Sequence, residues 1–170
     1  FRDYARWLAT RENVRLHLCV QSGTRLAQEL KSLSLPTLEF PSMCGPLPVG
    51  MSRRLARFQD ELEIDWVHFH WKNDLPLVAL AKSLARRRVC VIHSRHMDLP
   101  GPKRDPYHWY MYRSIDVFHA ITRAVALQAM EHLPIPRSRI KQVYLGAAAV
   151  TRSPEESRLA LRARLGLADR

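Results

Sequence analysis

Short apolar runs alternate with amphipathic segments along most of the chain, and this alternation limits the fold more than any other feature of the sequence. The runs over 14–20, 65–70 and 89–93 are rich in β-branched and aromatic residues, which is typical of strands. The segments between them repeat apolar residues at helical spacing. Strands that alternate with helices favour a parallel sheet. The sequence therefore predicts an α/β fold with a doubly wound, mostly parallel sheet and helices on both faces.

The same periodicities predict the other elements and one change in organisation. From Ala147 onward the composition shifts toward Ser, Pro, Glu, Arg and Ala, which predicts a domain over 1–150 followed by a linker and terminal helix over 151–170. The chain begins at Phe1 and ends in a charged stretch, and we expect it to be part of a longer protein. Helices are predicted over 2–12, 24–33, 51–62, 74–87, 106–114 and 123–132, further strands over 37–40, 115–121 and 140–145, and loops over 41–50 and 95–107.

The chain is strongly basic, with a net charge of +11 and a pI near 10.3. Such a balance favours an anionic partner: nucleic acid, an acidic membrane surface or a phosphorylated substrate. One function compatible with it is a basic α/β domain that binds nucleic acid or another polyanion without catalysis. The sequence shows no recognised nucleic-acid motif, and its aromatic residues are not interleaved with the basic clusters, so we do not expect nucleic acid as the partner.

The predicted helix over 51–62 is basic and amphipathic, with Leu55 and Phe58 on one face and Arg53, Arg54 and Arg57 elsewhere. These arginines either keep an exposed helix solvated or contact anionic lipid headgroups. No apolar run reaches the about 18 residues needed to span a bilayer, and no signal peptide opens the chain. We therefore expect a cytoplasmic protein, with Arg53, Arg54 and Arg57 as candidate membrane-facing residues at the inner face of the cytoplasmic membrane.

Cys19, Cys44 and Cys90 are an odd, widely spaced set without the spacing of a metal site. Cys19 and Cys90 lie within strand-like runs, where a free cysteine behaves as a small buried hydrophobic residue. This cysteine usage favours a reducing compartment.

Polar residues gather where three of the predicted strands end. In doubly wound folds, ligands bind outside the carboxyl ends of the strands. His68 and His70 lie at the end of the first of these strands, Ser94–His96 follows the second, and His119 and Thr122 close the third. Imidazole can donate, accept or carry charge near neutral pH, which suits contact with sugar hydroxyls or phosphate oxygens. Converging from adjacent strands, these groups would line one rim of the sheet.

These histidines have other interpretations. A histidine within a strand is often a structural residue with satisfied hydrogen bonds, and strand alternation is expected to turn His93 and His119 away from His96. His68 and His70 share a strand face that His96 could approach, but no cysteine or carboxylate cluster completes a metal shell. We therefore predict no metal site.

Several segments form an ordered set of motifs. Asp65–His70 has the pattern D-hydrophobic-hydrophobic-H-x-H, Ser94–His96 has the pattern Ser/Thr-x-His, and His119–Thr122 is similar to a strand that ends in A-V-S. Residues 135–144 are similar to (I/V)-P-x-x-(K/R)-I-x-V-(I/Y), and residues 161–167 are similar to R-x-x-L-G-L. In this order and spacing the set resembles the N-terminal, acceptor-side domain of glycosyltransferases with the GT-B fold, specifically glycosyltransferase family 4.

The sequence departs from that family's pattern in two respects. Leu145-Gly146-Ala147-Ala148 stands where N-G-(V/I)-D is common. The family's initial strand with its glycine-rich loop, and its nucleotide-binding domain with the E-x7-E signature, have no counterpart in these residues. The resemblance therefore implies a Rossmann-like acceptor-binding domain over 1–150, one lobe of the GT-B fold, which lacks its first strand and pairs with a C-terminal nucleotide-sugar-binding domain.

The activity that the resemblance implies is retaining transfer of a sugar, of the hexosyltransferase type, from a nucleotide-diphosphate donor to a hydroxyl acceptor without an obligatory metal. The expected acceptor is a glycolipid or a precursor of a cell-envelope polysaccharide such as lipopolysaccharide. This domain would bind no cofactor of its own and would be inactive alone. His96 would be the catalytic residue, in contact with the donor sugar. The other residues implied at the sugar and acceptor site are Ser94, Arg95, His70, Lys72, Asn73 and Thr122.

Overall fold

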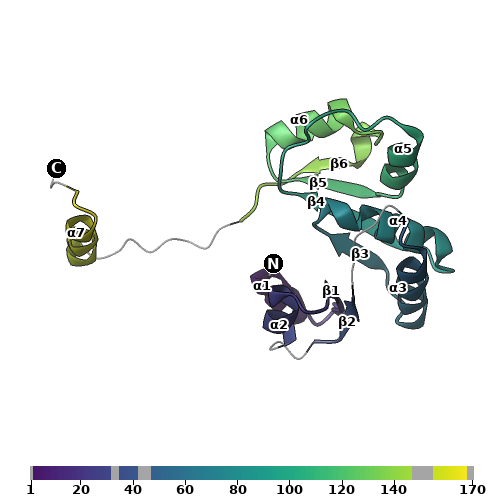
Figure 1. The fold of residues 1–170 in the computed structure, drawn as a ribbon, viewed down its shortest axis with the longest axis horizontal. Coiled ribbons are helices and arrows are strands. Elements are labelled where there is room, and N and C mark those ends of the chain that lie inside the picture. The colour runs from purple at the N-terminus through teal and green to yellow at the C-terminus, as the bar shows by residue number, and fades with distance from the viewer. Residues whose placement is uncertain (1, 32–34, 42–46, 147–154, 168–170) are drawn as a thin grey trace.

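The computed structural model describes residues 2–31, 35–41, 47–146 and 155–167, in which helices and strands alternate (Figure 1). The described strands form two parallel sheets, one of β1 and β2 and one of β3, β4, β5 and β6 in chain order. The predicted α/β class, with parallel sheets flanked by helices, is confirmed. The elements are α1 (Arg2–Ala9), β1 (Leu18–Gln21), α2 (Arg25–Lys31), β2 (Thr37–Phe40), α3 (Val49–Glu61), β3 (Trp66–Phe69), η1 (Lys72–Asp74), α4 (Leu75–Leu84), β4 (Cys90–Arg95), α5 (Pro106–Arg113), β5 (Val117–Ala120), α6 (Arg123–His132), η2 (Arg137–Arg139), β6 (Ile140–Gln142) and α7 (Glu155–Arg164).

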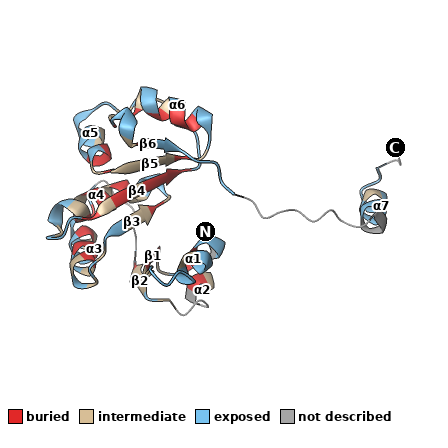
Figure 2. Ribbon diagram, turned by 180° about the vertical axis from the view of Figure 1, so that it is seen from behind, coloured by how far each residue is buried: buried red, intermediate tan, exposed pale blue. Residues whose placement is uncertain are grey.

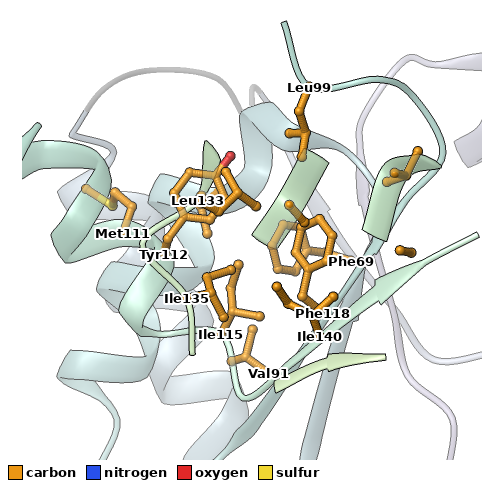
Figure 3. Close-up of a cluster of buried hydrophobic side chains, with 14 of the residues drawn as sticks. Phe69, Val91, Leu99, Met111, Tyr112, Ile115, Phe118, Leu133, Ile135 and Ile140 are labelled. Carbon is orange, nitrogen blue, oxygen red and sulfur yellow. The ribbon is translucent and has the colours of Figure 1, made fainter. Parts of the chain in front are cut away.

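The main hydrophobic core lies between the four-stranded sheet and the helices α4, α5 and α6 (Figure 3). Val91 of β4 and Phe118 of β5 are fully buried in it, as is Ile115, which precedes β5. These residues belong to the apolar runs that predicted the strands, and their burial explains why the runs are nearly continuous in hydrophobicity. Red, buried segments concentrate on the helix surfaces that face this sheet (Figure 2).

The two-stranded sheet has helices on both faces. On one face, Leu18 and Val20 of β1 pack with Ala5 of α1 and Leu30 of α2. On the other, Phe40 of β2 lies in a separate cluster with residues of α3 and α4. The layer of α3 and α4 therefore supports both sheets, although no backbone pairing joins β1 to β3 in the described part of the chain.

The other face of the four-stranded sheet is partly open to solvent. Trp66 of β3 is 61% exposed on that face, and Ile92 of β4 and Val117 of β5 are only half-buried. Cys90 shares the face and is half-buried, as is Cys19, so neither cysteine has the full burial that the sequence suggested. This open face leads to the rim where β3, β4 and β5 end.

Several boundaries differ from the sequence predictions for physical reasons. α4 ends at Leu84 rather than near residue 87, because the Asp60 carboxylate accepts the backbone N–H groups of Arg86 and Arg87 at 3.0–3.1 Å and fixes that segment outside the helix. β4 continues to Arg95, two residues beyond the predicted end at 93, so Ser94 and Arg95 are strand residues and the loop does not begin at 95.

The C-terminal segment contains α7, within the region where a terminal helix was expected. Residues 147–154, which include the beginning of the linker predicted from 151, lie outside the described residues, as does Cys44. Leu159, Leu161, Leu165 and Leu167 in and after α7 are exposed. Among the described residues, no helix is both long enough and apolar enough to cross a membrane.

Candidate functional site

Three adjacent strands bring polar side chains together on the open face of the four-stranded sheet. His68 comes from β3, Ser94 from β4 and His119 from β5, and the parallel register places Ser94 directly beside His119. The Ser94 hydroxyl lies 2.7 Å from Nε2 of His68 and 2.7 Å from Nδ1 of His119. Nε2 of His119 lies 2.8 Å from the carbonyl oxygen of Val143. Ser94 is buried at the centre of this arrangement.

A second imidazole pair lies just beyond the ends of β3 and β4. Nδ1 of His70 is 3.1 Å from Nε2 of His96, and the ring of His70 lies 4.4 Å from that of His68 between centroids. The Tyr4 hydroxyl of α1 lies 3.4 Å from Nδ1 of His68. We call His68, His70, Ser94, His96 and His119 the histidine cluster.

Burial keeps the inner part of the histidine cluster uncharged near neutral pH. Burial and the neighbouring imidazoles of His119 and His96 lower the pKa of His68 to about 4. Burial and the imidazoles of His68 and His96 lower the pKa of His70 to about 4. The pKa of His96 is also lowered, first by burial and then by His119. His68 and His70 are therefore neutral donors and acceptors near neutral pH, which suits hydroxyl groups better than anions.

The other predicted site residues are distributed around this rim. Arg95 points to the opposite side of β4, where it is buried and donates to the carbonyl oxygens of Met97 and Asp98, which holds the following loop in place. Lys72 and Asn73 lie exposed on η1, immediately after β3. The Thr122 hydroxyl caps α6 by accepting the N–H of Val125 at 3.2 Å. The structure thus brings His70, Ser94 and His96 into one cluster and places Lys72, Asn73 and Thr122 near the strand ends.

The expectation that His119 turns away from His96 is wrong, because its hydrogen bond to Ser94 places it in the histidine cluster. Alternation within one strand does not set the parity of the next strand, which depends on their register. For His93 the alternation holds: its ring stacks on Phe69 at 4.3 Å between centroids and meets the edge of Phe118 in the core.

Two further residues near the rim, Tyr4 and Asp74, were not predicted from the sequence. Tyr4 belongs to a helix that is distant from the strand ends in sequence, and only the fold brings it to His68. Asp74 at the end of η1 has a pKa raised to about 6 by burial, which no sequence pattern reveals. Asp74 follows Lys72 and Asn73 directly, so the segment that was expected to border the acceptor also holds a titratable carboxyl.

The three arginines of the basic helix α3 lie in two different environments. Arg54 lies 5.3 Å from the centroid of the Phe40 ring, in a cation–π arrangement. Arg53 and Arg57 line a groove with the end of α4, where Arg86 also lies. In the described parts of the chain, no group of three or more His, Cys, Asp or Glu residues has an arrangement that could hold a metal ion.

Comparison with known proteins relates this arrangement to a family. The model of Glycosyltransferase Family 4 matches residues 1–148, which contain both sheets and every described element except α7. The chain belongs to glycosyltransferase family 4. The strand ends that form the histidine cluster all lie within the matched residues.

A solved structure shows the same fold. The crystal structure of a glycosyltransferase from Rickettsia africae ESF-5 superposes with a TM-score of 0.64 and 16% sequence identity, over 88% of this chain and 41% of that one. This chain therefore spans 41% of the length of that structure and corresponds to one part of it. No curated protein sequence matches the chain.

Proposed function

We propose that this chain is the acceptor-binding half of a retaining glycosyltransferase, which moves a sugar from a nucleotide-diphosphate donor to a hydroxyl acceptor. The observation that supports it most directly is the histidine cluster at the carboxyl ends of β3, β4 and β5, in a chain that belongs to glycosyltransferase family 4. In an open parallel α/β sheet, this rim is where ligands bind. A cytoplasmic enzyme that acts on a glycolipid or on a polysaccharide precursor is the form of the proposal that fits the basic surface.

The geometry of the rim supports one assignment of roles. His96 is the exposed member of the histidine cluster and follows the last residue of β4, so it is the residue we assign to the donor sugar. His70 supports it through the 3.1 Å hydrogen bond, and Lys72 and Asn73 border the acceptor from η1. The nucleotide itself would bind to a second domain that faces this rim. Groups fixed in place before the reaction stabilise developing charge without reorganising, which is how such a rim would accelerate transfer.

Replacing His96 with alanine tests this assignment in an enzyme that contains both domains. We expect turnover to fall more than about tenfold, because one oriented donor at the reacting sugar is removed. The thermal unfolding midpoint should stay near that of the parent, since His96 is exposed. His132→Gln, which changes a histidine on α6 outside the cluster, is the control and should keep its turnover. Unchanged turnover in His96→Ala would remove this residue from the site.

A specific surface also supports contact with an anionic membrane. Arg53, Arg57 and Arg86 surround a groove between α3 and α4 that contains Leu84, whose side chain is 46% exposed. Basic groups beside an exposed apolar residue match the headgroup and acyl boundary of an anionic leaflet. Asp60 and Glu61 line the same groove and partly offset its charge.

Sedimentation with phosphatidylglycerol vesicles tests the membrane contact. Changing Arg53 and Arg57 together to alanine should weaken vesicle binding by roughly 30-fold, because each basic residue near such a surface contributes about 1 kcal/mol. The matched control changes Arg137 and Lys141, two exposed basic residues elsewhere, to alanine. Equal losses in both variants would show that net charge alone drives binding. Tighter binding to a polyanion such as heparin, with a steep dependence on salt, would instead favour the polyanion-binding alternative.

A further inference from the structure

Four hydrogen bonds run in a row from α1 to the end of β6. The Tyr4 hydroxyl lies 3.4 Å from Nδ1 of His68, and Nε2 of His68 lies 2.7 Å from the Ser94 hydroxyl. The same hydroxyl lies 2.7 Å from Nδ1 of His119, whose Nε2 lies 2.8 Å from the Val143 carbonyl oxygen. Each bond joins a different pair of elements, so the row crosses the whole rim.

The direction of these bonds follows from the Val143 carbonyl, which accepts a hydrogen and has none to donate. Nε2 of His119 must therefore carry its hydrogen, and in the neutral ring Nδ1 is left as an acceptor. Ser94 then gives its single hydroxyl hydrogen to His119 and can only accept from His68. Nε2 of His68 must donate in turn, which leaves its Nδ1 without a hydrogen and open to a donor.

The outermost bond is the weakest of the four. The Tyr4 contact at 3.4 Å is long for a hydrogen bond between hydroxyl and nitrogen, whereas the other three are 2.7–2.8 Å. Tyr4 is also 40% exposed, so solvent and ligands can reach this end of the row. The acceptor at Nδ1 of His68 is therefore only partly satisfied by the protein.

We propose that His68, Ser94 and His119 form one relay in which the Val143 carbonyl fixes the tautomers of both histidines, and that its outer end, beside Tyr4, is a binding site for a ligand hydroxyl, which Nδ1 of His68 accepts. A fixed acceptor on a neutral ring selects O–H groups and rejects carbonyl, carboxylate and phosphate oxygens, which have no hydrogen to give. The assignment of this hydroxyl to a sugar rests on the proposed function. Ser94 and His119 act as positioning residues, because they orient His68 without reaching the ligand.

The tautomers can be measured directly in this chain by nitrogen-15 NMR of the imidazole rings near pH 7.5. We expect His68 and His119 both to carry hydrogen on Nε2. His132 is the internal reference for the opposite tautomer, since its Nδ1 donates to the Leu99 carbonyl at 3.2 Å. A hydrogen on Nδ1 of either His68 or His119 would overturn the relay.

Two variants separate the relay from ordinary packing. Tyr4→Phe should leave both tautomers unchanged, because the direction is set from the Val143 end. Ser94→Ala should release His68 to a mixture of tautomers while His119 keeps its bond to Val143. A single tautomer at His68 in Ser94→Ala would contradict the proposal, and if that variant fails to fold, the parent and Tyr4→Phe measurements still decide it.

Methyl α-glucopyranoside is the probe for the hydroxyl site. We expect it to shift the Nδ1 resonance of His68 in the parent chain and not that of His132, with binding about fivefold weaker in Ser94→Ala because one hydrogen bond loses its fixed acceptor. An unchanged Nδ1 resonance at saturating probe would refute the hydroxyl site. These readouts need no sugar transfer, so they stand or fall separately from the turnover of His96→Ala.

Discussion

Replacing Phe118 with alanine is expected to lower the free energy of unfolding by about 4 kcal/mol. Phe118 is fully buried in β5, where its ring packs among the apolar residues that join the four-stranded sheet to α4, α5 and α6 (Figure 3). It also meets the ring of His93 edge to face, with centroids 5.4 Å apart. Alanine would remove these contacts and leave a cavity that the surrounding strands cannot close, because β5 is paired on both sides.

Urea denaturation followed by circular dichroism measures this change. Leu127→Ala is the matched control, because Leu127 lies on α6 with 56% of its side chain exposed, and its loss should cost less than about 0.5 kcal/mol. A small effect of Phe118→Ala, close to that of the control, would mean that the core between the sheet and these helices is not packed as described.

The second large expected effect is a loss of stability at acidic pH, caused by His93. Burial lowers the pKa of His93 to about 3, and neither of its ring nitrogens has a hydrogen-bond partner in the described part of the chain. In the unfolded chain the same imidazole titrates near its ordinary value of about 6.5. Below about pH 6.5 the imidazole is protonated in the unfolded state but stays neutral in the folded state. The free energy of unfolding therefore decreases as the pH falls from about 6.5 toward about 3. At pH 5 the loss from His93 alone is about 2 kcal/mol relative to pH 8.

The variant His93→Leu isolates this contribution. We expect the difference in unfolding free energy between pH 8 and pH 5 to shrink by about 2 kcal/mol, since leucine cannot be protonated. His68 and His70, whose pKa values are lowered to about 4, would still weaken the fold in acid, though less than their shifts suggest because both are partly exposed to solvent. As a control, Ile115→Val should cost about 1 kcal/mol equally at both pH values. An undiminished acid sensitivity in His93→Leu would show that His93 is not the buried neutral group described.

The fold could be predicted from sequence because its signal is local. β3, β4 and β5 each coincide with an apolar run, and the helix over Arg123–His132 and the strand over Thr37–Phe40 were predicted to the residue. The predicted ends of elements were less accurate where they depend on residues distant in sequence. For example, α4 ends at Leu84, shortly before the point where Asp60 of α3 accepts the backbone N–H of Arg86.

The candidate site could be predicted only in part, for the same reason. The strand ends identified His70, Ser94 and His96, which do lie together. The face of His119 depends on the register between β4 and β5, and register is a property of two strands rather than of one. The raised pKa of Asp74 depends on burial by segments that are far from it in sequence.

The split between the two sheets has a mechanical consequence for the histidine cluster. α1 packs on β1, and the two-stranded sheet packs through side chains on α3 and α4, without a backbone ladder to β3 in the described residues. Side-chain packing gives way to sliding more readily than backbone hydrogen bonds between strands. We therefore expect α1, with Tyr4, and the two-stranded sheet to tilt as one unit while β3, β4 and β5 stay rigid. A ligand that widens the gap between Tyr4 and His68 is therefore expected to strain the packing of the two-stranded sheet on α3 and α4, and to leave the backbone pairing of β3, β4 and β5 intact.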